Sequence, residues 1–223
     1  MEFQRARSEE QREQRRTAIL ETTAAMLAEM SVSSVSLNEL SRRVGLAKSN
    51  VLRYFESREA ILLDLLDAEI SDWVVAVDRL LDATVEGEPH ERADTVAARV
   101  TASLAERPVM CDLISAQAAV LERNISMDVA LRHKYATGAS VMVLIEAIVR
   151  VLPELDAQAA YEVVAITFLM TSAAWPHSQP SEALLAAYAA DPAVAAGQTD
   201  FSEFVRRTLE LTISGLLVRR AMS

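Results

Sequence analysis

The sequence predicts an all-helical protein, and three observations support this fold class. Apolar residues recur at spacings of three and four along the whole chain, and no stretch alternates convincingly with a period of two. Half of the 223 residues (51%) are hydrophobic, which is enough for a substantial core and excludes a disordered chain. Only five glycines are present, and no two lie close together. The chain therefore lacks the glycine motifs of Rossmann domains, P-loops and nucleophile elbows, which excludes most α/β enzymes that handle nucleotides.

The N-terminal third predicts three helices and the start of a fourth. Ser36 and Glu39 form a capping box that opens a short helix, and Gly45 interrupts the chain soon afterwards. Ser57 caps a long helix, and the SVSSV stretch is expected to be a loop. The expected helices span about residues 8–29, 36–43, 47–54 and 58–83.

The remaining chain predicts six more helices, which brings the total to nine or ten. Pro108, Pro153 and Pro176 mark expected helix boundaries, and two stretches, WPHSQP and DPAVAAGQTD, are expected to be irregular. The expected helices span about residues 91–106, 109–123, 127–152, 157–174, 181–190 and 201–220, of which the fifth is the least regular.

A domain boundary is expected near residue 56, giving domains 1–56 and 57–223. The formal net charge of −10 argues at first against a polyanionic partner such as DNA. However, residues 1–60 hold ten basic and nine acidic residues, whereas residues 61–223 hold twelve and twenty-three. The negative charge therefore belongs to the larger domain, and nucleic acid is not excluded as a partner of the smaller one.

Residues 36–55, SLNELSRRVGLAKSNVLRYF, carry the clearest functional pattern. Leu37, Leu40 and Val44 give the first short helix one apolar face, and Gly45 supplies the freedom for a sharp turn. The next helix is expected to be anchored by Val51, Leu52 and Phe55 and to present polar side chains outward. Such a pair is typical of a helix-turn-helix, whose second helix lies in the major groove, although an ordinary helical corner has the same outline.

The stretch from Arg16 to Leu66 resembles the N-terminal domain of the TetR family of transcriptional regulators. The matching positions are Ser36, Leu40, Gly45, Leu46, Tyr54, Phe55, Ser57, Arg58 and Glu59. Two positions depart from the pattern: Leu52 replaces a frequent tyrosine that touches the DNA backbone, and Arg58 replaces a frequent lysine. The resemblance implies a three-helix DNA-binding domain followed by a larger helical domain for ligand binding and dimerisation.

Roles at the DNA follow from residue chemistry and from this resemblance. Ser49 and Asn50 are expected to contact base edges, since asparagine pairs bidentately with adenine. The phosphate-positioning candidates are Ser36, Lys48, Arg53, Tyr54 and Arg58. Arg42 and Arg43 are either flanking contacts or a solvated face. The arginines before Thr17 form either a flexible arm on the DNA or an ordinary solvated helix start, since Glu9, Glu10 and Glu13 dilute them.

The larger domain is expected to form a homodimer and to enclose an effector. The resemblance implies that helices 157–174 and 201–220 pair with a second copy in a four-helix bundle, and their apolar content agrees. Gln117 and Thr137 are the polar groups expected to orient a ligand on an otherwise apolar lining. His133, within the charged stretch RHKY, is expected to be exposed. The full set of candidate lining residues is Trp73, Met110, Cys111, Ile114, Gln117, Leu121, Met127, His133, Thr137, Val141, Phe168, Met170 and Trp175.

Several classes of site are not expected. His90, His133 and His177 lack metal-ligand spacing, so neither a metal nor a cofactor is predicted. Cys111 is the single cysteine and is expected to be a buried apolar residue. No segment has the features of a secretory signal or reaches the length of a membrane span, so a soluble cytoplasmic protein without membrane contact is expected.

The leading hypothesis is a ligand-responsive repressor that binds double-stranded DNA at a palindromic operator as a homodimer and is released by a small, largely apolar effector. An activator is equally compatible with DNA binding. The alternatives are a ligand-independent regulator or interaction module, which a core filled by its own side chains would favour, and an all-helical enzyme. No nucleophile motif, cofactor motif or distinctive carboxylate pair supports an enzyme.

Overall fold

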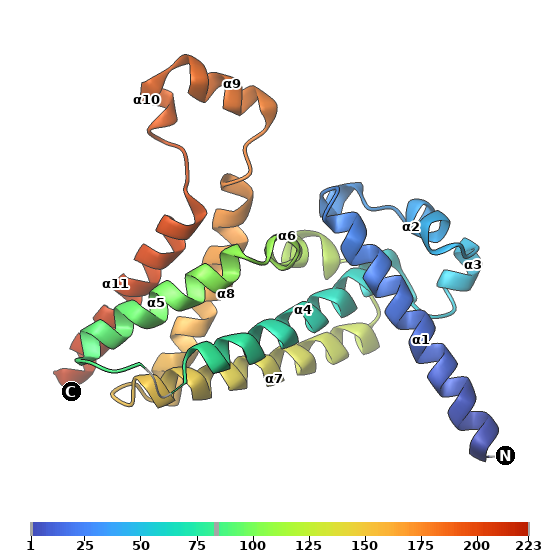
Figure 1. The fold of residues 1–223 in the computed structure, drawn as a ribbon, viewed down its shortest axis with the longest axis horizontal. Coiled ribbons are helices and arrows are strands. Elements are labelled where there is room, and N and C mark those ends of the chain that lie inside the picture. The colour runs from blue at the N-terminus through green and yellow to red at the C-terminus, as the bar shows by residue number, and fades with distance from the viewer. Residues whose placement is uncertain (1, 83–84, 223) are drawn as a thin grey trace. The chain divides into compact units, whose positions relative to one another are not determined.

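The computed structural model describes residues 2–82 and 85–222, and every regular element in them is helical. The helices are α1 (Glu2–Leu27), α2 (Leu37–Val44), α3 (Lys48–Val51), α4 (Arg58–Leu80), α5 (Pro89–Ala105), α6 (Pro108–Ala116), α7 (Met127–Val151), α8 (Ala157–His177), α9 (Glu182–Ala190), α10 (Pro192–Ala195) and α11 (Phe201–Ala221) (Figure 1). A 3₁₀ turn (Val32–Ser34) and a π-helical turn (Gln117–Leu121) complete the set. The all-α prediction is confirmed, with eleven α-helices in the described residues.

The chain divides into two compact units, and each unit is made of two segments that are separate in the sequence. The first unit comprises Met1–Glu69 and Ala116–Tyr135, and the second comprises Ile70–Ser115 and Ala136–Ser223. Three continuous segments, in α4, in α7 and at the junction of α6 with the π turn, run from one unit into the other. The expected boundary near residue 56 lies in the loop before α4, and it stays a prediction.

The first unit is organised around the buried side of α1. Ile19 and Met26 are fully buried, as their helical spacing predicts, and α1 packs against α2. The helix begins at Glu2 instead of the expected cap at Ser8. Of the two alternatives for the arginines before Thr17, the structure shows the helical one, because α1 runs through this stretch. The side chains of Arg5 and Arg7 lie outside the part that the structure describes.

In the second unit, α11 packs against both α5 and α8. Between α8 and α11 the chain leaves this packing as an excursion that contains α9 and α10 (Figure 1), and neither short helix has a buried residue. Among the described helices only α8 is long and apolar enough to cross a membrane, and 39% of its most apolar window is buried within the fold.

Prolines explain several of the misplaced helix ends. Pro89, Pro108 and Pro192 each occupy the first position of a helix, where the missing N–H costs nothing because that donor has no intrahelical partner. The expected stop before Pro176 is wrong, because α8 runs to His177 with Pro176 in its last turn. The expected end of α4 at Ala83 lies outside the described residues.

Candidate nucleic-acid interface

The turn between α2 and α3 is fixed by local hydrogen bonds. Ser36 caps α2 by accepting a hydrogen bond from the Glu39 amide at 3.2 Å. Gly45 ends the helix in the left-handed region (φ +72°), and the next amide, of Leu46, donates to the Ser41 carbonyl at 3.0 Å. A side chain at position 45 would be strained at this φ, which explains why glycine follows Val44.

The segment from α3 to residue 55 has an apolar anchor and a polar outer face. Val51 is fully buried and Phe55 is nearly so, and hydrogen-bonded turns continue past the end of α3 to Phe55. Leu52, expected as an anchor, is instead 41% exposed, because it lies one residue beyond Val51 and hence a quarter-turn away from the buried face.

Four exposed polar side chains occupy this outer face, namely those of Lys48, Ser49, Asn50 and Arg53. Within the described part of the chain, none of the four makes a hydrogen bond or ion pair with another side chain or with a carbonyl. Tyr54 is half-buried beside them. The helix therefore presents donors and acceptors with no structural task of their own, which is the chemistry that reads base edges and phosphates.

The two arginines of α2 are engaged in an ion-pair cluster. Arg42 donates to the Glu39 carboxylate at 2.6 and 3.0 Å, and Arg43 donates to Glu39 at 3.0 Å and to Glu29 at 2.7 Å. These hydrogen bonds lower the pKa of Glu39 to about 2. The Arg42 side chain remains 73% exposed, against 26% for Arg43, so Arg42 is the better placed of the two for a flanking contact.

Arg58 makes several hydrogen bonds within the first unit. Its guanidinium donates to the carbonyls of Val32 and Val35 and bonds Glu59 at 3.2 Å. These bonds tie the start of α4 to the loop before α2. The donors that would contact a phosphate already face protein oxygens, and the expected phosphate contact of Arg58 stays a prediction.

Arg16 supports the segment that follows α3, although in the sequence it lies among the N-terminal arginines. Its guanidinium lies 4.2 Å from the centre of the Phe55 ring, donates to the Tyr54 carbonyl at 2.7 Å and pairs with Asp64. Burial raises the pKa of Asp64, an effect that Arg16 opposes. The clue available in the sequence was spacing: Arg16 lies three residues before the buried Ile19, on the same face of α1.

A buried polar network joins three other segments of the first unit. His133 is 1% exposed, with its Nδ1 2.6 Å from an Asp67 oxygen and its Nε2 2.9 Å from the Gln117 amide nitrogen. Gln117 also donates to Glu122, which binds Lys134 at 2.6 Å. The expectation of an exposed His133 is wrong: it follows the buried Val129 by four residues on α7, and that periodicity outweighs its charged neighbours.

Several of the residues expected to line an effector cavity are buried in the core of the second unit. Trp73 is fully buried, donates its indole N–H to Ser103 at 3.0 Å and meets the Phe168 ring edge-on, with ring centres 5.8 Å apart. The void lined by Trp73 and its apolar neighbours measures only about 10 Å³. This core is therefore closed, since ligand cavities usually span about 300–1,000 Å³.

The other expected lining residues are distributed as follows. Met110, Cys111 and Ile114 are buried in the second unit, and burial raises the pKa of the Cys111 thiol to about 12. Val141 and Met170 are partly exposed there, whereas Leu121 is buried in the first unit. Met127 is 74% exposed, so its expected place in a cavity lining is wrong.

Three buried hydroxyl groups among the described side chains have no hydrogen-bond partner, those of Thr101, Thr137 and Thr171. Each unpaired buried hydroxyl lowers the stability of the fold by about 1–3 kcal/mol, so such groups are unusual in a well-packed core. All three belong to the second unit. No group of three or more potential metal ligands occurs among the residues that the structure describes.

Comparison with known families decides what kind of protein carries this interface. Residues 19–65 match the model for bacterial regulatory proteins of the tetR family, and residues 67–220 match the tetracyclin repressor-like C-terminal domain. The chain belongs to the TetR family. It is thus a DNA-binding transcriptional regulator with an N-terminal helix-turn-helix, and the expected membership is confirmed.

Solved structures agree on the fold. A TetR regulator from Rhodococcus sp. RHA1 is 16% identical, with a TM-score of 0.55 and coverage of 92% of this chain and 96% of that one. A possible TetR family regulator from Streptomyces coelicolor A3(2) is 20% identical (TM-score 0.55, coverage 91% and 98%). FadR from Bacillus subtilis, solved in complex with stearoyl-CoA, is 14% identical (TM-score 0.58, coverage 89% and 98%). No curated protein matches this TetR-family chain.

Proposed function

We propose that this TetR-family regulator is a cytoplasmic repressor that binds a palindromic operator as a homodimer and responds to a small effector. The observation that carries the DNA-binding part is the set of four unpaired polar side chains on the outer face of the segment from α3 to residue 55. Because Val51 and Phe55 hold the opposite face in the core, the backbone that carries these side chains is anchored without contact to DNA. Preorganisation of this kind lowers the entropy cost of binding.

Within this proposal the side chains have distinct roles. Ser49 and Asn50 read base edges in the major groove, while Lys48 and Arg53 bind phosphates. Tyr54 adds a hydroxyl at the end of the segment, and the Ser36 hydroxyl can still donate to a phosphate because its cap uses only a lone pair. Arg16 contacts no DNA in this scheme and supports the recognition segment from behind.

The outer faces of α8 and α11 support homodimerisation. On α11, Phe204, Leu211 and Val218 are 47–59% exposed and follow one another at seven-residue spacing, which places them in one stripe. On α8, Tyr161 and Leu169 are 49% and 61% exposed. Pairing these faces with a second copy would remove the stripes from water. A symmetric dimer would then read two half-sites spaced by about 34–36 Å or a multiple of it.

The effector part of the proposal requires the closed core of the second unit to open. A void of about 10 Å³ admits no effector, so binding has to displace packed side chains and thereby select a different conformation. The unpaired hydroxyl of Thr137, one of the polar groups predicted to orient a ligand, supports an occupant with a polar group. A solved relative of the same fold carries stearoyl-CoA, so an elongated acyl compound is a reasonable first class to test.

A ligand-independent regulator is the second candidate, and the filled core favours it. Hydrogen exchange of the α5 and α8 amides, measured with and without acyl compounds, distinguishes the effector-responsive regulator from the ligand-independent one. An effector-responsive protein should show faster or slower exchange there together with weaker operator binding. Unchanged exchange and unchanged DNA affinity across the series would leave the ligand-independent function.

DNA binding is tested by fluorescence anisotropy with the DNA upstream of the protein's own coding sequence. A scrambled duplex of the same length and composition, at the same salt concentration, is the control. We expect tighter binding to the upstream DNA and a steep salt dependence, with a log–log slope of about −0.9 per phosphate contact. Equal affinity for both duplexes would contradict operator-specific binding.

A further inference from the structure

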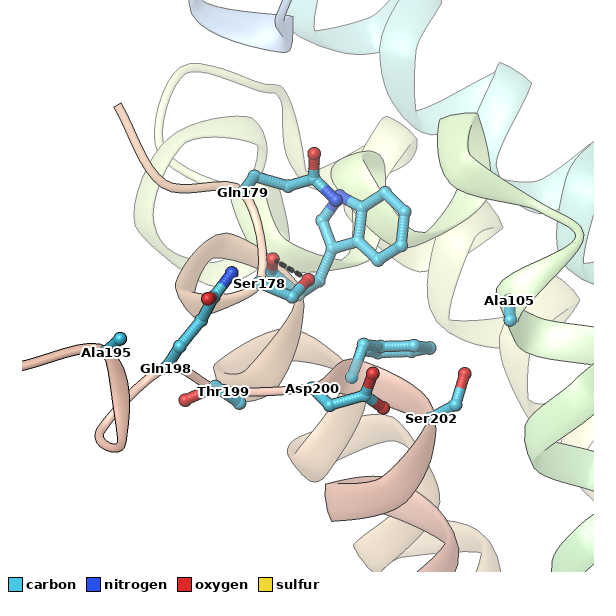
Figure 2. A pocket seen from close by; sticks show the side chains of 10 residues that line it. Ala105, Ser178, Gln179, Ala195, Gln198, Thr199, Asp200 and Ser202 are labelled. Atoms are coloured by element: carbon cyan, nitrogen blue, oxygen red, sulfur yellow. Dashed lines mark hydrogen bonds between the residues drawn. The ribbon is translucent and has the colours of Figure 1, made fainter. Parts of the chain in front are cut away.

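The second unit contains an open hollow that the proposed function does not use. It lies where α5 and α8 end and α11 begins, and its volume is about 600 Å³. Figure 2 shows Gln179, Gln198, Asp200 and Ser202 around this hollow, with Ala105 across from them. The remaining lining residues are Trp175, Ser178, Ala195, Thr199 and Phe201. Its size falls in the range of small-molecule sites, unlike the closed core around Trp73.

An aromatic pair forms one wall of the hollow. Trp175 and Phe201 meet edge-on, with ring centres 5.2 Å apart. Phe201 is buried and fixed at the start of α11, while Trp175 is only partly buried and so offers ring surface to the hollow. The prediction that Trp175 contacts a ligand thus concerns a place other than the core that contains Trp73.

The polar side chains of the hollow are largely unpaired. Those of Gln179, Gln198, Thr199 and Ser202 make no hydrogen bond to any described group. Ser178 differs, because its hydroxyl donates to the Trp175 carbonyl at 2.7 Å. These amides and hydroxyls can donate and accept in an arrangement that no internal structure requires.

Asp200 provides the only formal charge among the lining residues. One carboxylate oxygen accepts from the Glu203 amide at 2.7 Å and caps α11, and the second oxygen is left for a ligand. The N-terminal end of the α11 dipole and the C-terminal end of the α8 dipole both border the hollow, and they oppose each other in sign. The carboxylate therefore sets the preference of the site for positive charge.

An aromatic surface, a single carboxylate and several free amides line the same hollow, and together they are the recognition chemistry of an organic cation. We propose that this hollow binds a small organic ammonium or guanidinium compound, with the cation over Trp175 and against Asp200. The site is separate from the core in which we place the acyl effector. Its occupancy is measurable without DNA, so failure of this proposal and failure of the proposed function are distinguishable.

The test is isothermal titration calorimetry of the full-length protein with benzylammonium, and with benzyl alcohol as the uncharged probe of similar shape. We expect benzylammonium to bind at least tenfold more tightly, together with a change in Trp175 fluorescence that is absent in Trp175→Phe. Equal affinity of the two probes, or no binding of benzylammonium, would overturn the proposal.

The decisive variant is Asp200→Asn, with Asp191→Asn as its matched control. Asparagine caps helices as well as aspartate does, so D200N removes the charge and keeps the cap of α11. Asp191 caps α10 through the Ala193 amide at 2.8 Å and does not line the hollow. We expect D200N to weaken benzylammonium binding about tenfold and D191N to leave it unchanged. If both variants weaken benzylammonium binding equally, the general acidity of the surface explains the preference for the cation, and the proposed site is wrong.

Discussion

Two surfaces of this regulator, one in each unit, present opposite kinds of side chain. On the outer face of α3 the unpaired groups are polar, whereas on α8 and α11 the exposed groups are leucine, valine, phenylalanine and tyrosine. Unpaired polar groups are hydrated by water and remain free to bind a polar partner. Exposed apolar stripes are unfavourable in water and usually mark an interface. The comparison supports both proposals: a single chain presents the surface of α3 that we propose reads DNA, and α8 and α11 pair with a second copy.

The largest effect is expected from a charge placed in the apolar stripe of α11. Leu211→Glu should convert the dimer to a monomer and reduce operator affinity about a hundredfold, because one half-site then binds alone. Sedimentation velocity and anisotropy measure the two effects. Leu184→Glu, an equally exposed leucine of α9 outside the stripe, is the matched control and should remain dimeric. A dimeric L211E would contradict the assignment of α8 and α11 as the interface.

A smaller effect is expected at the polar surface. Asn50→Ala should weaken operator binding by about 1–3 kcal/mol and leave binding to scrambled DNA unchanged, since a base contact carries the discrimination. Lys48→Ala should weaken both duplexes and make the salt slope less steep by about one unit per contact. If N50A and K48A behave alike on both duplexes, the division between base and phosphate contacts is wrong.

The support of the recognition segment is the next test. Arg16→Met keeps much of the stem packing but removes the bond to the Tyr54 carbonyl and the pair with Asp64, leaving a buried carboxyl without its partner. We expect about 1–3 kcal/mol less stability toward urea. Arg12→Met, at a fully solvated position on the same helix, should change stability by less than about 0.5 kcal/mol. A similar loss of stability in the two variants would show that Arg16 does not support the recognition segment.

The smallest effect concerns the ion-pair cluster of α2. The pKa of Glu39 is lowered in the folded state, so the cluster contributes above the ordinary carboxyl range and is lost as the pH falls toward about 2. In Arg43→Gln the carboxyl keeps only Arg42, and its titration should move to higher pH. NMR titration of the side-chain carboxyl measures this shift, and an unchanged midpoint would show that Arg43 does not contribute.

Much of the fold and the outline of the reading element could be predicted because their causes are local. Helical periodicity, the Ser36 cap and the Gly45 turn each depend on residues three to five apart, and so they are visible in the sequence. The polar face of α3 follows from the same periodicity. A local signal also misled at Pro176, which reads as a helix boundary but lies in the last turn of α8.

The sequence by itself determined the helical class, the helix-turn-helix and the segregation of negative charge into residues 61–223. Only the tertiary structure decided which of several similar arginines remain free for DNA. Arg16 meets residues 38 and 48 positions away, and Arg58 meets carbonyls 23 and 26 positions away. Tertiary packing also buried His133 against Asp67, 66 residues away, and closed the core around Trp73. Contacts at such separations depend on how helices pack, and the residue types at either end do not specify the partner.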